Sequence, residues 1–259
     1  MNCLSKKILE SVYSKYNIPD LIHPDPLEFL FNYPKEREIV GIIASSLAYG
    51  RVNLILKTVD DVLKKMGSSP LSYIKDTPIK SMQDDFKNFK YRFTTEYDLI
   101  DLLAALKNSL KDFKTLENLF LSEYSHTDEN IVNSAIAFVS NLHRYSPSKK
   151  INLIPNPILG SACKRLNLYF RWMIRKDNVD QGGWNSVSPS KLIIPLDTHM
   201  FYFGSTYGFT KRKSADLKAA IEITNGFKNF SPDDPVKYDF ALTRFGIHPD
   251  MKWDDFENI

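Results

Sequence analysis

The sequence of 259 residues has few of the residues that build disulfide-linked or metal-bearing folds. Its two cysteines, Cys3 and Cys163, are too few for a disulfide framework and do not form a CxxC pair. Its five histidines are scattered and do not form a zinc-binding pattern. We therefore expect a protein of the reducing cytosol with no metal.

Long apolar runs are also absent. No segment approaches the roughly eighteen apolar residues of a membrane-spanning helix, and the amino-terminal stretch MNCLSKKILESVYSKY lacks the apolar core of a signal peptide. The net charge is only +3, so the overall charge does not require a polyanionic partner. These observations favour a cytoplasmic protein without membrane contact.

Several common catalytic motifs are missing. The sequence contains no GxxxxGK[ST], GxGxxG, GxSxG or HExxH pattern. These absences argue against a P-loop NTPase, a dinucleotide-binding domain, an α/β-hydrolase and a zincin metalloprotease. Any chemistry must therefore be sought in less common combinations of residues.

Helical periodicity dominates the rest of the sequence. Apolar residues recur on one helical face in three segments: Val52, Ile55, Leu56, Val59, Val62, Leu63 and Met66; Leu99, Leu102, Leu103, Leu106 and Leu110; and Ile131, Ala135, Phe138, Val139 and Leu142. The segment IVGIIASSLAYG is apolar on nearly all sides, which predicts a buried central helix. Strand candidates are few, KLIIPL being the best, and no hairpin turn signal accompanies them.

This pattern predicts an all-α protein with two helical lobes and a cleft. We expect one catalytic unit over residues 1–259, with a central lobe of residues 36–176 and a terminal lobe of residues 1–35 plus 177–259. Ser214 is the expected cap of a helix that stops at Gly226. Asp234 and Pro235 are expected to begin a further helix that ends near Gly246.

The stretch GSACKRLNLYFRWMIRKD, residues 160–177, is the most informative. Ser161 is the expected N-cap of a helix whose core face carries Leu166, Tyr169, Phe170, Met173 and Ile174. Lys164, Arg171 and Arg175 occupy the opposite arc, with Leu168 and Trp172 alongside. Two interpretations stay open, a solvated basic face or a surface that binds phosphates.

One lysine and one aspartate stand out as candidate catalytic groups. Lys164 lies in the first helical turn, where the helix dipole favours the neutral amine that a Schiff-base nucleophile needs. Asp197, in KLIIPLDTHM, follows a short apolar run and precedes Thr198 and His199. Asp197 is expected either to cap the next helix or to take part in a reaction. The pair suggests a lyase.

The segment IPLDTHM resembles the VDTHV signature of helix-hairpin-helix DNA glycosylases of the endonuclease III superfamily. The resemblance implies that Asp197 is the catalytic acid and that Lys164, in GSACKRLNL, is the Schiff-base nucleophile. The long gap between them is most similar to that of archaeal 8-oxoguanine glycosylases. Read with DPVKYDFALTRFGI, the whole chain is identified as a member of an uncharacterised bacterial family, a domain of unknown function, grouped with these enzymes.

The resemblance also implies where DNA and the damaged base are held. The segment IIASSLAYGRVNLILKTVDDVL is similar to the glycosylase helix pair whose connecting turn faces the damaged base pair. The implied DNA-binding residues are Tyr49, Gly50, Arg51, Asn53, Gly160, Ser161, Arg165, Arg171, Arg175, His199, Lys211 and Arg212. Trp172 and Trp184 are the candidate base pocket, with Trp184, in VDQGGW, either a stacking wall or a loop anchor.

Two departures from those enzymes are visible. The usual hairpin LPGVG is replaced by NPILGSA, and the four-cysteine iron–sulfur site is absent. No iron–sulfur cluster or other cofactor is therefore expected.

The expected function is removal of an oxidised base, with 8-oxoguanine favoured, by a bifunctional DNA glycosylase and lyase. Its expected partner is double-stranded DNA carrying a damaged base, and we expect a monomer associated with the nucleoid. Two alternatives stay open. One is a non-catalytic helical DNA-binding protein with the same fold. The other is an unrelated helical hydrolase in which Asp197 is only an N-cap.

Overall fold

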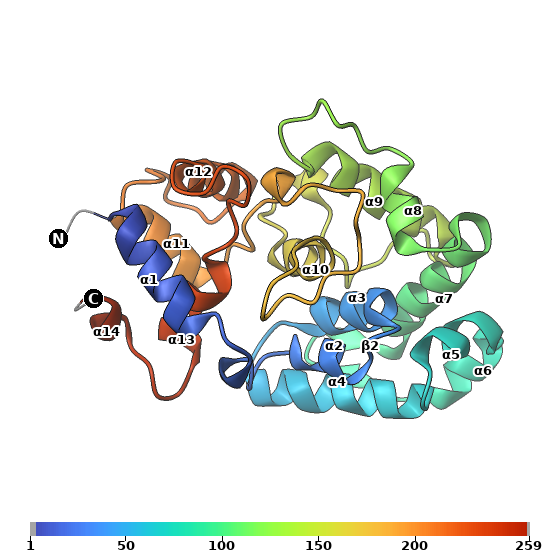
Figure 1. Ribbon diagram of the computed structural model, residues 1–259. Coiled ribbons are helices and arrows are strands. Elements are labelled where there is room, and N and C mark those ends of the chain that lie inside the picture. The colour runs from blue at the N-terminus through green and yellow to red at the C-terminus, as the bar shows by residue number, and fades with distance from the viewer. Residues whose placement is uncertain (1–3, 258–259) are drawn as a thin grey trace. The chain divides into compact units, whose positions relative to one another are not determined.

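A computed structural model describes residues 4–257, and in this range the chain is mostly helical (Figure 1). The expected all-α class is confirmed, while Cys3 lies outside the described residues. None of the helices in residues 4–257 combines the length and the apolar character required to span a membrane.

The elements follow one another along the chain with short connections. The helices are α1 (Lys6–Tyr16), α2 (Glu28–Asn32), α3 (Arg37–Leu47), α4 (Val52–Met66), α5 (Pro70–Asp76), α6 (Ile79–Asp85), α7 (Glu96–Phe113), α8 (Leu116–Leu121), α9 (Val132–Tyr145), α10 (Lys164–Ile174), α11 (Thr198–Thr206), α12 (Leu217–Lys228), α13 (Asp239–Ile247) and α14 (Trp253–Glu257). Single 3-10 turns lie at Pro19–Leu21, Pro157–Leu159 and Pro189–Lys191. Strands β1 (Lys90–Tyr91) and β2 (Thr94–Thr95) form an antiparallel hairpin.

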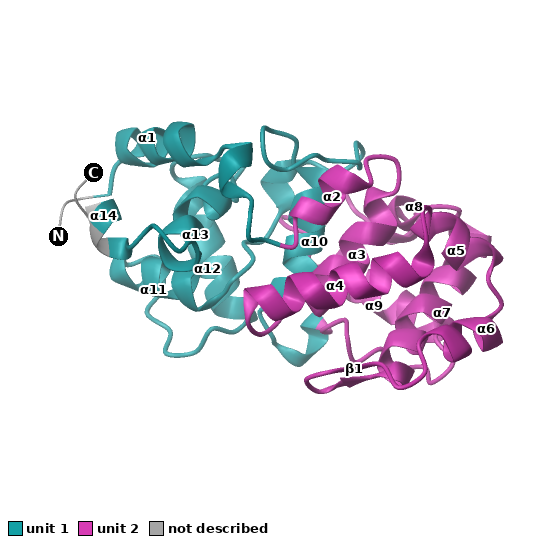
Figure 2. Cartoon of the chain, turned by 90° about the horizontal axis from the view of Figure 1, so that it is seen from below, with its two compact units in different colours: residues 1–25, 157–259 teal, residues 26–156 magenta. Residues whose placement is uncertain are grey.

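The chain divides into two compact units, shown in different colours in Figure 2. Unit 1 contains residues 1–25 and 157–259, and unit 2 contains residues 26–156. The expected lobes divided the chain after residues 35 and 176, whereas the observed units divide it after residues 25 and 156. Helix α10 therefore groups with the terminal segments, in the same unit as Asp197.

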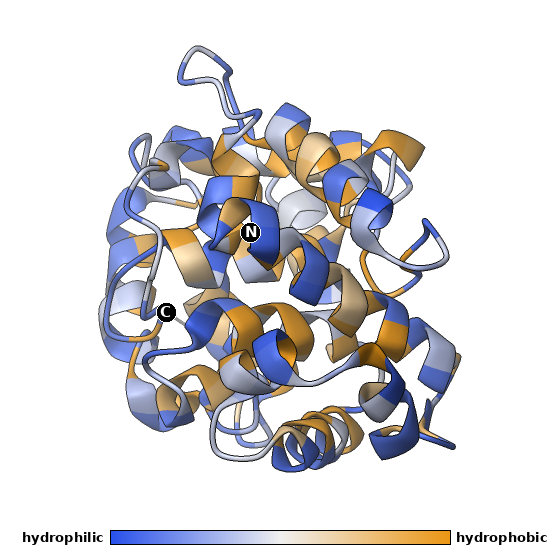
Figure 3. Cartoon of the chain, turned by 90° about the vertical axis from the view of Figure 1, so that its right-hand side faces the viewer, coloured by the Kyte–Doolittle hydropathy of each residue, from blue (hydrophilic) through white to orange (hydrophobic). Residues whose placement is uncertain are grey.

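Unit 2 is built around α3. Every residue of this helix from Ile39 to Leu47 is buried, which confirms the prediction of a central helix. The other predicted stripes lie on α4, α7 and α9, and nearly all of their apolar residues are buried. Figure 3 shows hydrophobic and hydrophilic residues alternating along the helical ribbons. Helix α7 begins with a capping box formed by Thr95 and Asp98.

Unit 1 has an aromatic core. The Phe203 ring of α11 stacks on Phe227 of α12 at 5.7 Å and meets Phe256 of α14 edge-on at 5.5 Å. On α13, Phe245 meets Tyr16 of α1 edge-on at 5.0 Å. Aromatic contacts of this geometry add to the free energy gained by burial alone. They fix α11, whose first turn carries Asp197, against its neighbours.

The predicted strand KLIIPL is wrong. Among the described residues the only strands are β1 and β2, and residues 192–196 form a buried irregular segment instead. Pro195 lacks an N–H group, and the Ile194 N–H donates to the Thr224 hydroxyl at 3.0 Å rather than to a neighbouring strand. The apolar run therefore reflects burial, not sheet pairing.

Two predicted helix starts also differ. Helix α12 is capped by Asp216, which accepts a hydrogen bond from the Ala219 N–H at 2.9 Å, and not by Ser214. Helix α13 begins at Asp239, five residues after Asp234. The Asp234 carboxylate instead pairs with Arg175, so it does not cap α13.

Helices α11 and α13 pack closely where His199 meets Gly246. A Cβ atom added at Gly246 would lie 2.2 Å from Nδ1 of the His199 ring. We expect Gly246→Ala to lower the free energy of unfolding by about 1–3 kcal/mol through overpacking, even though alanine is the better helix former. Chemical denaturation monitored by circular dichroism measures this change.

The matched control introduces Gly246→Ala into a His199→Ala background. Because the clashing ring is then gone, the glycine substitution should be neutral or stabilising. An equal loss of stability in both backgrounds would contradict the packing interpretation.

Candidate functional site

Asp197 is the N-cap of α11. Its Oδ1 atom accepts a hydrogen bond from the Met200 N–H at 2.8 Å, and its backbone is extended (φ −105°, ψ −173°). The preceding residues, 192–196, are buried, whereas Asp197 is half-buried and Thr198 is exposed. The predicted capping role is therefore confirmed. The capping bond also holds the carboxylate at the boundary between core and solvent.

Lys164 is the first residue of α10. The N-cap is Cys163, a left-handed residue (φ 49°) whose side chain makes no capping hydrogen bond. The prediction of Ser161 as the N-cap is wrong, because its hydroxyl accepts from the Cys163 N–H at 3.2 Å, just before the helix. Lys164 is half-buried, and its side chain forms no hydrogen bond or ion pair within the described residues. Its amine is therefore not engaged by a side-chain carboxylate.

Arg171 and Arg175 are buried, with 3% and 2% of their surfaces exposed. The Nε and Nη2 atoms of Arg171 donate to Asp180 Oδ1 at 3.2 and 3.0 Å, and its Nη1 atom donates to Asp239. The expected exposed basic face of this helix is therefore wrong. A buried guanidinium requires carboxylate partners because an unpaired buried charge is very costly.

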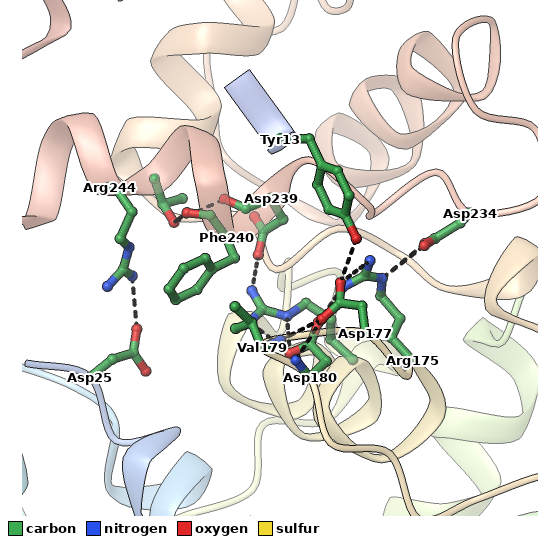
Figure 4. Close-up of polar contacts among 12 residues, drawn as sticks. Tyr13, Asp25, Arg175, Asp177, Val179, Asp180, Asp234, Asp239, Phe240 and Arg244 are labelled. Atoms are coloured by element: carbon green, nitrogen blue, oxygen red, sulfur yellow. Dashed lines mark hydrogen bonds and ion pairs between the residues drawn. The ribbon is translucent and has the colours of Figure 1, made fainter. Parts of the chain in front are cut away.

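Arg175 has three acidic partners. Its Nε atom lies 3.0 Å from Asp234, its Nη2 atom donates to Asp177 at 2.8 Å, and its Nη1 atom pairs with Asp180 (Figure 4). The Tyr13 hydroxyl donates to Asp177 at 3.0 Å. We call Arg171, Arg175, Asp177, Asp180, Asp234 and Asp239 the ionic cluster. Since its guanidinium groups are enclosed in ion pairs, the hypothesis that they bind phosphates is wrong.

The ionic cluster has more acidic than basic groups, with four carboxyl groups around two guanidinium groups. Burial raises the pKa of Asp239 to about 6; Arg171 opposes this rise, and the negative charge of Asp197 adds to it. The Oδ1 atom of Asp239 is buried and has no hydrogen-bond partner. Asp197 therefore lies near enough to Asp239 for the charges of the two carboxyl groups to interact.

Lys164 shares a helix face with the ionic cluster. Seven residues separate Lys164 from Arg171 in α10, and this spacing corresponds to about two helical turns. One face of α10 thus presents an amine at its start and a guanidinium bound to Asp239 further along. That Lys164 and Asp197 face one cleft stays a prediction.

Other predicted DNA-binding residues meet at the start of α10. Gly160 and Ser161 are exposed, and the Gly160 carbonyl accepts from the Leu217 N–H at 2.9 Å. Ser161 forms an antiparallel bridge with Asp216, which binds the Arg212 guanidinium. The loop before α10 therefore lies beside the Arg212 segment, where Lys211 is also exposed. Arg165, the second residue of α10, is half-buried.

The expected base pocket is not formed by the two tryptophans. Trp172 is fully buried and Trp184 is 2% exposed. The Trp184 ring packs against Tyr169 and Phe170, with centroid distances of 5.6 and 6.0 Å. The stacking-wall interpretation of Trp184 is wrong and the loop-anchor interpretation is confirmed. His199 is half-buried against Gly246, so its ring is partly engaged in packing.

In unit 2, the turn between α3 and α4 carries the remaining predicted residues. Gly50, Arg51 and Asn53 are exposed, while Tyr49 is half-buried and donates to the Tyr91 carbonyl at 2.9 Å. The β1–β2 hairpin beside this turn carries Arg92 and Phe93, which sequence reasoning missed. Its strands have two residues each and its turn has no glycine or asparagine, so it gave no recognisable hairpin signal.

The protonation of Asp239 predicts a specific pH dependence of stability. Its pKa is raised from 3.8 to about 6 in the folded protein, so its contribution to stability is fully present below about pH 4 and is lost as the pH rises through about 6. The free energy of unfolding of the wild type, relative to Asp239→Asn, should fall by on the order of 3 kcal/mol across this window. Urea titrations at a series of pH values measure the difference.

Asp216→Asn is the control with the opposite sign. The pKa of Asp216 is lowered mainly by the hydrogen bond from Arg212 and, to a smaller extent, by that from the Ala219 N–H. The contribution of Asp216 to the free energy of unfolding should therefore grow as the pH rises. Asparagine retains the capping ability at this site. A pH-independent difference between wild type and Asp239→Asn would refute the assignment to Asp239.

Comparisons with known proteins place the chain in a family. Residues 25–248 match the family described as "Protein of unknown function (DUF2400)". No curated protein and no solved structure matches the chain. The match spans α2 to α13 and includes Lys164, Asp197 and every acidic residue of the ionic cluster. Because it covers well over half of the sequence, the chain belongs to the DUF2400 family of proteins of unknown function.

Proposed function

We propose that the protein is a DNA glycosylase and lyase that excises an oxidised base through an imine on Lys164. The observation that carries this proposal is the setting of Asp197. Its carboxylate is held at a helix start by the Met200 N–H and reaches the boundary between core and solvent. A fixed negative charge of this kind stabilises a positive charge that develops on a nearby substrate atom.

The proposed reaction begins with a damaged nucleotide flipped out of the duplex. The Lys164 amine attacks C1′ of the sugar as the bond between C1′ and the base nitrogen breaks. The base leaves with the bonding electron pair and takes up a proton, and the substituted amine loses one, with Asp197 as the acceptor. Asp197 also stabilises the cationic character of the sugar ring. Ring opening gives the imine, from which elimination of the 3′ phosphate cleaves the strand.

DNA binding is proposed to use groups outside the ionic cluster. The first turn of α10 has no side-chain cap and carries Lys164 and Arg165, so its N–H groups and positive dipole end favour a phosphate. Gly160, Ser161 and Lys211 are exposed in the adjoining loops. In unit 2, Arg51 and Asn53 are exposed after α3. Arg171 and Arg175 instead support the helix that carries Lys164.

Two substitutions test the reaction. Lys164→Gln should abolish trapping of a protein–DNA adduct by borohydride, because no imine can form, while leaving the fold unchanged. Asp197→Asn keeps a competent N-cap, so the free energy of unfolding should change by no more than about 1 kcal/mol. Its single-turnover rate of base excision should fall by roughly a hundredfold or more, because the negative charge is lost.

Lys218→Gln is the matched control, since Lys218 is an exposed lysine in the first turn of α12. It should trap as efficiently as the wild type. If Lys164→Gln still forms the trapped adduct, another amine is the nucleophile and the proposal for Lys164 is wrong. Near-normal turnover by Asp197→Asn would show that the carboxylate serves only as a helix cap.

The proposed substrate is an oxidised purine, with 8-oxoguanine ranked first. This ranking rests on the spacing of Lys164 and Asp197 along the chain. A panel of duplexes carrying 8-oxoguanine, an oxidised pyrimidine, an alkylated base, uracil or an abasic site should show fastest cleavage at the oxidised purine. Cleavage confined to uracil or to alkyl-adenine would overturn the ranking.

A second candidate function is DNA binding without catalysis. It is favoured by the fact that the Asp197 side chain already has a structural use as the cap of α11. The trapping experiment separates the two candidates. Retention of DNA without any trapped adduct on any lesion supports the binding protein.

A further inference from the structure

The β1–β2 hairpin of unit 2 presents a phenylalanine to solvent. Phe93 is 85% exposed, and Tyr97, which follows in α7, is 73% exposed. Tyr91 pairs with Thr94, so Arg92 and Phe93 form the two-residue turn at the hairpin tip, at the margin of this unit (Figure 2). An aromatic ring that is so exposed contributes little to the packing of its own unit.

The turn residues are not those that a tight hairpin prefers. Two-residue hairpin turns favour glycine or asparagine because they require positive φ angles. Here Arg92 has a φ of 52°, which is uncommon for a residue with a side chain. Turn formation therefore does not explain why an arginine and a phenylalanine occupy the tip.

The hairpin is firmly attached to the turn between α3 and α4. The Tyr91 hydroxyl donates to the Tyr49 carbonyl, and the Tyr49 hydroxyl donates to the Tyr91 carbonyl at 2.9 Å and lies 2.6 Å from the Thr94 hydroxyl. The two tyrosine rings are 4.9 Å apart. Gly50 has a φ of 100°, and a Cβ atom there would lie 2.5 Å from Nη1 of Arg92. Arg92 thus lies directly against a glycine.

Cationic side chains lie close to Phe93. The Arg92 guanidinium lies 5.7 Å from the Phe93 ring and 5.9 Å from the Tyr49 ring. Lys87, Lys90 and Arg51 are exposed on the hairpin and on the neighbouring turn.

The nearby carboxylates are engaged locally. Glu96 accepts a hydrogen bond from the Asn88 N–H, and Asp98 accepts from the Thr95 N–H at 2.7 Å and from Asn152 at 2.8 Å. On α6, Asp85 accepts from the Tyr73 hydroxyl at 2.7 Å, and Asp84 lies 3.6 Å from Lys80. These contacts orient the carboxylates toward their own segments, while the Arg92 guanidinium stays beside the exposed Phe93 ring. An exposed flat ring next to a guanidinium fits a polyanion that carries flat apolar groups.

We propose that this hairpin is a base-stacking site, at which the Phe93 ring stacks on an unpaired base of DNA while Arg92 binds an adjacent phosphate. Aromatic stacking of this kind tolerates any base and requires a base that is not already stacked in a duplex. The site rests on the DNA partner of the proposed function, but it does not need the reaction at Lys164. It is therefore expected to recognise locally opened DNA rather than a particular lesion.

The test uses the full chain and two labelled duplexes, one with a single unpaired 2-aminopurine and one fully paired. Fluorescence anisotropy measures affinity, and 2-aminopurine emission reports stacking. The wild type should bind the duplex with the unpaired base more tightly and quench its emission. Phe93→Ser should weaken that binding by roughly tenfold to a hundredfold and remove the quenching. Phe93→Trp should retain both.

Tyr202→Ser is the matched control, since Tyr202 is an exposed aromatic residue of unit 1. It should leave the preference for the unpaired base intact. An unchanged preference in Phe93→Ser would overturn the proposal. So would a Phe93-dependent dimer, seen by sedimentation, that shows no preference for the unpaired base.

The two proposals fail in different ways. A wild type that never forms a trapped adduct, yet quenches 2-aminopurine through Phe93, refutes the lyase and supports the stacking site. A wild type that forms the adduct and a Phe93→Ser variant that keeps the full preference refute the stacking site alone.

Discussion

The pairing of Arg171 and Arg175 with buried carboxylates is the interaction on which unit 1 depends. These two side chains leave one helix, α10, and reach Asp177 and Asp180 in the following loop, Asp234 before α13 and Asp239 at its start. The Tyr13 hydroxyl donates to Asp177 and so links α1 to the ionic cluster. Segments far apart in the sequence are thereby held by charge-assisted hydrogen bonds in a buried setting, where such bonds are strong and loss of one partner is costly.

The same interaction links fold and chemistry. The ionic cluster fixes α10, at whose start Lys164 lies, and its Asp239 carboxyl group is near enough to Asp197 for their charges to interact. Arginine suits this role because its guanidinium stays protonated when buried and can bind several carboxylate oxygens at once. In the proposed reaction the cluster holds the helix of the nucleophile in place but does not touch DNA.

Much of the fold could be predicted from the sequence, because the helical stripes of α4, α7 and α9 and the apolar α3 are local patterns. The role of Asp197 as a cap was also local and was predicted. The burial of Arg171 and Arg175 was not predicted, because the acidic partner Asp239 lies 68 residues from Arg171 in the sequence. Periodicity places a charged residue on a face but does not show whether distant carboxylates cover that face. The hairpin with Phe93 was missed because its two-residue strands and its turn give no local signal, and because Tyr91 is held by Tyr49, 42 residues earlier in the chain.

The central claim is that the Lys164 amine bonds to C1′ of a damaged nucleotide in DNA. Peptide mapping by mass spectrometry, after borohydride reduction in the presence of 8-oxoguanine duplex and nuclease digestion, tests this most directly. We expect one modified peptide, carrying a reduced sugar remnant on Lys164. A remnant on a different lysine, or no modified peptide with any of the damaged duplexes, would contradict the claim.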